Sequence, residues 1–166
     1  MFQYDAAGRV VVDTTQDAAG RVRSESRYAY DDQVRRTEWR LLGGRGELLG
    51  RSAYRYDGGE VAEVQNFDGA GALQETVAYS RDGDGRLRSE LVRDAGGTEL
   101  TRDDRSYAGD VLQSVAYFSA GVLVGSERFE YDAEGFITRT SSHGADDALK
   151  SYVVVDYAPA GQLVSP

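Results

Sequence analysis

His143 is the only histidine of the chain and the side chain best suited to general base catalysis near neutral pH. It stands between Ser142 and Gly144. A serine hydrolase needs an imidazole that is oriented by a carboxylate and hydrogen-bonded to its nucleophile, and no nucleophile-elbow pattern surrounds these residues. Because the chain has no cysteine, thiolate catalysis and disulfides are also excluded. We therefore predict a noncatalytic protein without catalytic residues.

Two glycine-rich stretches have residue types found in ligand-binding loops. The sequence Asp82-Gly83-Asp84-Gly85 could begin a calcium loop, but Arg86 and Arg93 fall at the fifth and twelfth positions, where oxygen ligands are required. Convergence of Asp pairs from neighbouring turns on calcium stays open as an alternative. The stretch 43–46 lacks the Gly-Lys-Ser/Thr ending of a phosphate loop. We predict turns here, with no metal site and no cofactor.

The charge pattern restricts the possible partners. The formal net charge is −9, and the arginines, including Arg35 and Arg36, alternate with acidic residues. This pattern opposes a broad nucleic-acid footprint. With 28 acidic residues, the choice of any glycosidase carboxylate pair would be arbitrary. No secretory signal is visible at residues 1–3, and no apolar run reaches the length of a membrane span.

Aromatic residues recur in pairs, two positions apart, and are the strongest binding feature of the sequence. They should form a row across alternate strands of a sheet. In one interpretation they pack against apolar residues at adjacent strand starts, such as Val10 and Leu87. In the other they form a shallow platform for glycans or peptides. The candidate binding residues are Tyr28, Tyr30, Tyr54, Tyr56, Phe129 and Tyr131.

These residues belong to a turn signature that returns thirteen times, in full form Tyr-Asp-x-x-Gly-Arg-Val as at residues 4–10. Each turn is preceded by a marker residue, which is the aromatic residue of the signature or its equivalent. The markers of successive odd-numbered turns are 24 to 26 residues apart, and the even-numbered turns fall midway between them. The odd markers are Tyr4, Tyr30, Tyr56, Arg81, Tyr107, Tyr131 and Tyr157, and the even ones are Gln16, Leu42, Phe67, Arg93, Phe118 and His143. Such alternation is typical of an antiparallel meander with its two kinds of turn at opposite ends of the strands.

Each part of the signature has a local role in this interpretation. Asp can accept hydrogen bonds from amides further round the turn, and Gly allows positive φ. The equivalent glycines are Gly8, Gly20, Gly46, Gly71, Gly85, Gly121, Gly135 and Gly161. The intervening runs of about six to eight residues suit strands and are too short for independent helices.

Composition indicates a thin, single-layered fold. Val, Leu, Ile and Phe number 35 of 166 residues, just above the roughly 20% level at which high net charge indicates disorder. Alternation places apolar residues on one face, for example Leu73, Val77 and Tyr79. The predicted fold class is all-β: one domain, residues 1–166, with about 12 short strands in a single antiparallel meander sheet. Because open sheets beyond ~10 strands usually curl or close, we expect this sheet to curl or spiral.

The repeated Tyr-Asp-x-x-Gly segments resemble the YD repeats of Rhs proteins, teneurins and toxin-complex proteins over nearly the whole chain. The matching segments are Tyr4-Asp5-x-x-Gly8-Arg9-Val10, Tyr28-x-Tyr30-Asp31, Tyr54-x-Tyr56-Asp57 and Phe129-x-Tyr131-Asp132-x-x-Gly135. Arg81 and the even turns depart from the motif. The resemblance implies a long sheet that spirals into a hollow shell, which in bacteria commonly encloses a toxic C-terminal domain.

Other parts of that family have no counterpart in the sequence. We find neither the Asp-Pro boundary segment that closes the bacterial shell nor a toxin domain after Val164. The resemblance therefore implies a noncatalytic wall segment, with self-association through edge strands or a protein cargo as its partner. Binding of glycans or proteins by exposed tyrosines is the alternative function. The family also implies a secreted or injected, extracellular protein.

Overall fold

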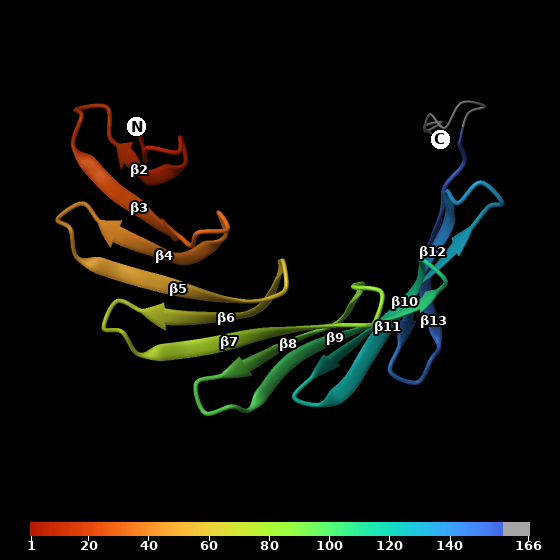
Figure 1. Cartoon of the computed structure of the whole chain (residues 1–166). Coiled ribbons are helices and arrows are strands. Elements are labelled where there is room, and N and C mark those ends of the chain that lie inside the picture. The colour runs from red at the N-terminus through yellow and green to blue at the C-terminus, as the bar shows by residue number, and fades with distance from the viewer. Residues whose placement is uncertain (158–166) are drawn as a thin grey trace. The chain divides into compact units, whose positions relative to one another are not determined.

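The structure, a computed structural model, describes residues 1–157 and consists of strands and turns (Figure 1). The strands are β1 (Phe2–Tyr4), β2 (Val10–Gln16), β3 (Val22–Tyr30), β4 (Arg36–Gly43), β5 (Leu48–Asp57), β6 (Glu60–Asp68), β7 (Leu73–Arg81), β8 (Leu87–Asp94), β9 (Glu99–Ala108), β10 (Val111–Ser119), β11 (Val122–Tyr131), β12 (Ile137–Gly144) and β13 (Leu149–Val154). Within this range no helix is long and apolar enough to cross a membrane.

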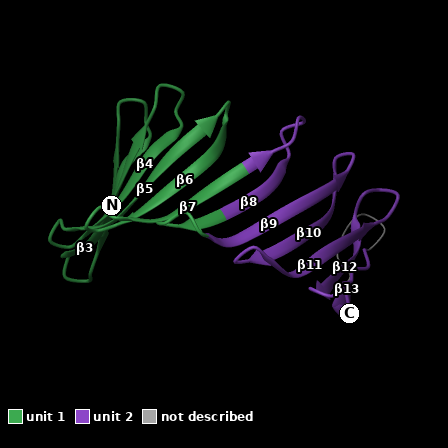
Figure 2. Ribbon diagram, turned by 90° about the horizontal axis from the view of Figure 1, so that it is seen from below, with its two compact units in different colours: residues 1–79, 92–98 green, residues 80–91, 99–166 purple. Residues whose placement is uncertain are grey.

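The thirteen strands form one sheet in sequence order, from β1 to β13. This order confirms the predicted all-β antiparallel meander, with one strand more than expected. The chain divides into two compact units, with boundaries inside β7 and β8 (Figure 2). Unit 1 comprises Met1–Tyr79 and Val92–Thr98, and unit 2 comprises Ser80–Leu91 and Glu99–Pro166. The predicted turn after Tyr157, with its Gly161, lies outside the described residues.

Most turns follow one pattern, which the first turn illustrates. The Asp5 amide donates to the Arg9 carbonyl (2.9 Å), and the Gly8 amide donates to the Asp5 carbonyl (3.0 Å). Gly8 has a φ of 79°, so this is a three-residue loop in which a residue in the left-handed region follows a tight turn. The same bonds recur after Gln16, Tyr30, Leu42, Phe67, Arg81, Arg93, Tyr131 and His143. The role predicted for glycine is confirmed at Gly8, although Val34 and Asp147 take that position in two other turns.

Three turns are shorter than the signature predicts. Their two central residues are 58–59, 109–110 and 120–121. Gly121, expected in the same position as Gly8, instead follows Ala120 in such a turn, and both have positive φ. Two-residue turns with positive φ match the right-handed twist of the flanking strands, so the chain closes these hairpins without the longer loop.

A β-bulge recurs in ten strand pairs, β1/β2 to β6/β7 and β9/β10 to β12/β13. In β1/β2, Tyr4 pairs with Val10 and Gln3 pairs with Val12, so Val11 is the extra residue. The extra residue always lies near the start of the strand that follows the turn. Bulges bend a strand and increase its twist, so a bulge at each of these ten hairpins makes a flat sheet unfavourable.

These bulges correct the predicted alternation on β7. Leu73 pairs with Phe67, whereas Glu75 pairs with the preceding residue, Asn66. Because successive residues of β6 point to opposite faces, Leu73 lies on the face opposite to Glu75 and Val77. The expected shared face of Leu73 and Val77 is therefore wrong, because one extra residue reverses the alternation.

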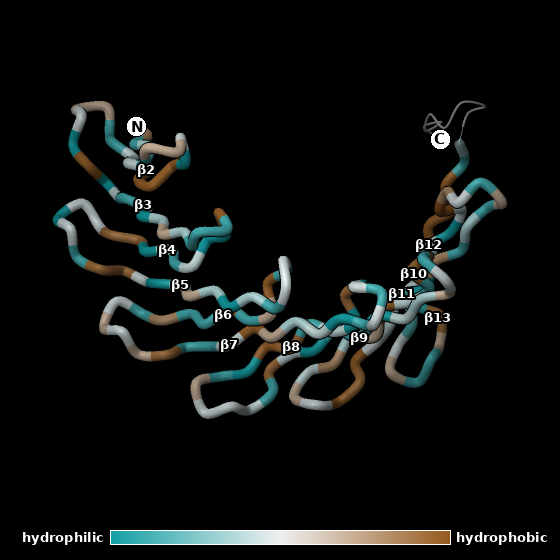
Figure 3. Tube along the Cα trace, viewed as in Figure 1, coloured by the Kyte–Doolittle hydropathy of each residue, from teal (hydrophilic) through white to brown (hydrophobic). Residues whose placement is uncertain are grey.

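Neither unit has a thick hydrophobic core. Among the described residues the one buried hydrophobic side chain is Val115, which is 6% exposed, while Thr14, Ser52 and Ser141 are buried polar residues. Hydrophobic and hydrophilic residues are interspersed along the strands (Figure 3). A single layer leaves both faces accessible, as the composition predicted.

Candidate binding surface

The tyrosine hydroxyl of the signature binds the backbone of the preceding hairpin in unit 1. Tyr30 Oη donates to the Val10 carbonyl at 2.9 Å, and Tyr56 Oη donates to the Arg36 carbonyl at 2.8 Å. The ladder between β2 and β3 starts at Val12, so the Val10 carbonyl lies beyond it and next to the bulge. Polar backbone groups need a partner when they are withdrawn from water. The tyrosine supplies this partner.

Unit 2 repeats the same contact. Tyr107 Oη donates to the Leu87 carbonyl at 2.9 Å, and Tyr131 Oη donates to the Leu112 carbonyl at 2.7 Å. In all four cases the acceptor lies at the start of the strand that follows the preceding odd turn. The recurring tyrosine thus joins successive hairpins. Two of its acceptors, Val10 and Leu87, are residues at strand starts against which the sequence analysis placed the aromatic residues.

The arginine of the signature covers the ring of the next tyrosine. The Arg9 guanidinium lies 5.0 Å from the centre of the Tyr30 ring, and its Nε is 2.6 Å from Asp5 Oδ2. The same pair of contacts joins Arg35 to Tyr56 and Asp31. It also joins Arg86 to Tyr107 and Asp82. Sequence reasoning missed this role, although the arginine that recurs directly after the last turn residue (Gly8, Val34 or Gly85) was a signal for it.

Two of these arginines also reach the next odd turn. Arg35 donates to the Gly58 carbonyl at 2.6 Å, and Arg86 donates to the Gly109 carbonyl. Both acceptors lie in two-residue turns. The guanidinium, with its five N–H donors, therefore connects an aspartate, a ring and a backbone carbonyl.

The aspartate of the signature organises its own turn. Asp31 Oδ1 accepts hydrogen bonds from the amides of Gln33 and Arg35, both at 2.9 Å. The Arg35 amide, together with the Arg35 side chain and the Gln33 amide, lowers the pKa of Asp31 below 3.8, although partial burial opposes this shift. A carboxyl with a lowered folded-state pKa stabilises the fold above pH 3.8 and loses this contribution as the pH falls through that lower pKa.

Tyr28 and Tyr54 have different surroundings from Tyr30 and Tyr56. The Arg36 guanidinium lies between them, 5.1 Å from the Tyr28 ring centre and 5.7 Å from that of Tyr54. Neither hydroxyl has a hydrogen-bond partner within residues 1–157. Trp39 pairs with Tyr28 across β3 and β4, which places its side chain on the same face. We call Tyr28, Arg36, Trp39 and Tyr54 the aromatic platform.

The six candidate binding residues therefore fall into distinct groups. Tyr30 and Tyr56 are used in contacts between hairpins, and Tyr28 and Tyr54 form the aromatic platform. In unit 2, Tyr131 makes the same type of contact as Tyr30, and Phe129 is half-buried opposite Thr140. The signal that sequence reasoning missed for the platform was the Arg35-Arg36 doublet after an odd turn.

The structure also places the groups considered for catalysis and calcium binding. Ser142 and His143 are successive residues of β12, so their side chains point to opposite faces. Asp82 Oδ1 accepts hydrogen bonds from the amides of Asp84 and Arg86, both at 3.0 Å. Its Oδ2 is paired with Arg86 at 2.9 Å. Within residues 1–157 no three His, Asp or Glu side chains gather in a group that could hold a metal ion.

Comparison with known proteins shows the fold but no family. No protein-family profile matches this chain, and neither does any curated protein. Among solved structures, a porin-like protein from Bacteroides uniformis ATCC 8492 is 13% identical with a TM-score of 0.56. The match covers 98% of this chain and 77% of that protein, and it shows a related β fold.

Two further matches include a Tc holotoxin pore. The TcdB2-TccC3 structure is 14% identical, and the Photorhabdus luminescens Tc holotoxin pore is 13% identical, each with a TM-score of 0.48. Each match covers 99% of this chain but 10% of the other chain. The chain thus spans a small fraction of these two proteins.

Proposed function

We propose that this chain is a noncatalytic structural repeat scaffold that resembles a wall segment of a YD-repeat shell. The supporting observation is that the residues of the recurring signature bind one another and the backbone. Tyr30 satisfies the Val10 carbonyl, Arg9 covers the Tyr30 ring, and Asp5 holds Arg9. A motif whose polar groups are used in this way builds a sheet and leaves few groups for catalysis.

We further propose that the scaffold assembles through its edge strands or encloses a protein cargo, and that it acts outside the cell as a secreted or injected protein. In the described sheet β1 and β13 are the end strands. On β13, Tyr152, Val153 and Val154 are 58%, 62% and 59% exposed. An exposed, apolar edge strand is a template for pairing with another chain.

Light scattering over a range of protein concentrations tests this assembly. We expect the particle mass to grow with concentration and the growth to be lost in Val153→Lys, because a charged lysine on an edge strand opposes pairing. Val124→Lys is the matched control, since Val124 is also exposed (49%) but lies on β11, which is paired on both sides. A constant mass, or equal growth in Val153→Lys, would contradict assembly through β13.

The aromatic platform supports a second function, the binding of carbohydrate or protein ligands. Its Tyr28 and Tyr54 hydroxyls have no partner within residues 1–157, and both rings flank the cationic Arg36. Aromatic rings with a polar tip are well suited to such contacts. This function requires the platform and not the tyrosines that join the hairpins.

A double substitution, Tyr28→Leu with Tyr54→Leu, tests the platform on a glycan array and a peptide array. We expect a folded protein that loses the binding shown by the unmodified chain. The circular dichroism spectrum verifies folding. Unchanged array binding by the folded double variant would show that the platform is not the site.

A further inference from the structure

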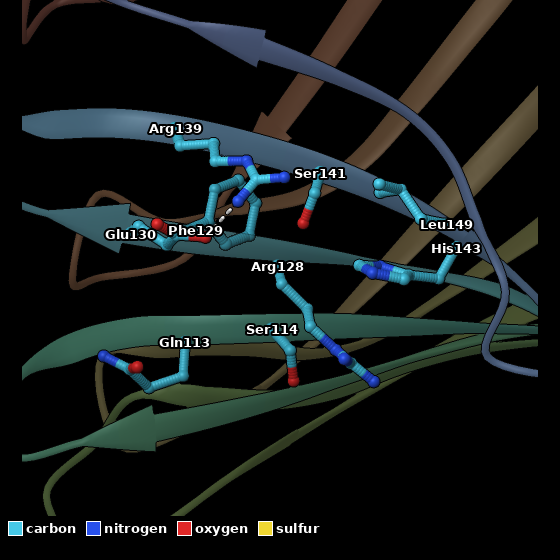
Figure 4. A pocket seen from close by; sticks show the side chains of 9 residues that line it. All are labelled: Gln113, Ser114, Arg128, Phe129, Glu130, Arg139, Ser141, His143 and Leu149. Carbon is cyan, nitrogen blue, oxygen red and sulfur yellow. Dashed lines mark hydrogen bonds and ion pairs between the residues drawn. The ribbon is translucent and has the colours of Figure 1, made fainter.

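Unit 2 has a polar depression that belongs to neither the hairpin contacts nor the aromatic platform. Its volume is about 460 Å³, within the range of roughly 300–1,000 Å³ typical of small-molecule sites. Strands β10, β11 and β12 and the first residue of β13 provide its lining (Figure 4). The lining residues are Gln113, Ser114, Arg128, Phe129, Glu130, Arg139, Ser141, His143 and Leu149.

The depression results from small side chains in the middle of the sheet. Ser114 pairs with Arg128, and Arg128 pairs with Ser141, so these three residues form one row on one face. Ser141 is 5% exposed and lies between the larger Arg139 and His143 on the same face of β12. Short serines beside long side chains leave a hollow.

The lining carries more hydrogen-bond donors than acceptors. Arg128 has one side-chain partner among the described residues, Asp147, and Arg139 is paired with Glu130 Oε1 at 3.1 Å. Each guanidinium has five N–H donors, so most of the donors of Arg128 are not used in these contacts. Its side chain is 49% exposed and can approach a ligand. Glu130 is the single carboxylate in the lining.

We propose that this depression binds an acidic monosaccharide through its carboxylate and hydroxyl groups. The planar fork of Arg128 suits bidentate contact with a carboxylate. Glu130 and Ser141 provide partners for sugar hydroxyls, and the half-exposed Leu149 offers an apolar contact for the C–H face of the ring. The proposed ligand carries one charge, which a protein of net charge −9 tolerates better than a polyanion.

Calorimetric titration of the whole chain with sodium glucuronate tests the site, with glucose as the uncharged analogue and acetate as the carboxylate without hydroxyls. We expect saturable binding of glucuronate, and at least tenfold weaker binding of both analogues. In Arg128→Gln the affinity for glucuronate should fall at least tenfold, because a hydrogen bond to a charged group is lost. Arg27→Gln is the matched control and should bind as the unmodified chain does, since Arg27 is an exposed, singly paired arginine of unit 1.

If Arg128→Gln fails to fold, Arg128→Lys keeps the charge but not the fork and should still weaken binding severalfold. The proposal would be overturned if glucuronate showed no saturable binding. Equal affinity for glucose or acetate, or full affinity in the folded Arg128 variants, would also overturn it.

Discussion

Tyr30→Leu is expected to lower the free energy of unfolding of unit 1 by about 2 kcal/mol or more. The substitution leaves the Val10 carbonyl without the hydroxyl donor at 2.9 Å, and an unsatisfied polar group costs roughly 1–3 kcal/mol when it is withdrawn from water. It also removes the ring beneath the Arg9 guanidinium, a contact that contributes about 0.5–1 kcal/mol at a partly exposed position. Urea denaturation followed by circular dichroism measures the change.

Two conservative variants separate these contributions. Tyr30→Phe removes the hydroxyl and keeps the ring, so we expect a loss of about 1 kcal/mol. Tyr28→Phe removes a hydroxyl that has no partner within residues 1–157, so its effect should stay within about 0.5 kcal/mol. If Tyr30→Phe were as stable as the unmodified chain, the bond to the Val10 carbonyl would not stabilise the fold.

Gly69→Ala is expected to destabilise unit 1 by roughly 1–3 kcal/mol, the usual cost of an overpacked contact. A Cβ atom on Gly69 would lie 2.3 Å from the Leu48 carbonyl oxygen. This neighbour is backbone, so it cannot turn away as a flexible side chain could. Gly44 has the same type of contact, because its Cβ would lie 2.4 Å from the Val22 carbonyl oxygen. Thermal and urea denaturation of the variant test the expectation.

Gly83→Ala provides the matched control. Gly83 follows Asp82 as Gly69 follows Asp68, and an added Cβ would meet nothing within 4 Å. The backbone at neither glycine has positive φ, so the two substitutions differ mainly in steric contact. Equal stability of the two variants would show that the sheet moves to accommodate the methyl group.

The contacts of Tyr30 and the close backbone approach at Gly69 give the two kinds of turn different roles. Tyrosine and arginine at odd turns join hairpins through a hydrogen bond and a ring contact. At the even turns after Leu42 and Phe67, glycine instead permits close approach of the backbone to the preceding hairpin. Substitutions at the two ends of the strands should therefore destabilise the fold for different physical reasons. Those at odd turns remove contacts, and those at these even turns introduce steric overlap.

The sequence by itself determined the all-β meander, the position of most turns and the thin core. Turn chemistry is local: Asp5 and Gly8 lie within one five-residue segment, so their hydrogen bonds and backbone angles follow from residue type and spacing. The alternation of odd and even turns could also be predicted from the sequence, because each strand pairs with its sequence neighbours. The low content of apolar residues likewise excluded a thick core before any contact was known.

Only the tertiary structure decided what the side chains of the repeat contact. The Tyr30 hydroxyl meets a carbonyl twenty residues away, and Arg9 meets the ring of the next odd marker; neither contact follows from local spacing. The bulges add one residue to most strands and thereby reverse which face a side chain occupies, as at Leu73. Whether a tyrosine is used in the fold or open to a ligand depends on these long-range registers, which a periodic sequence alone does not specify.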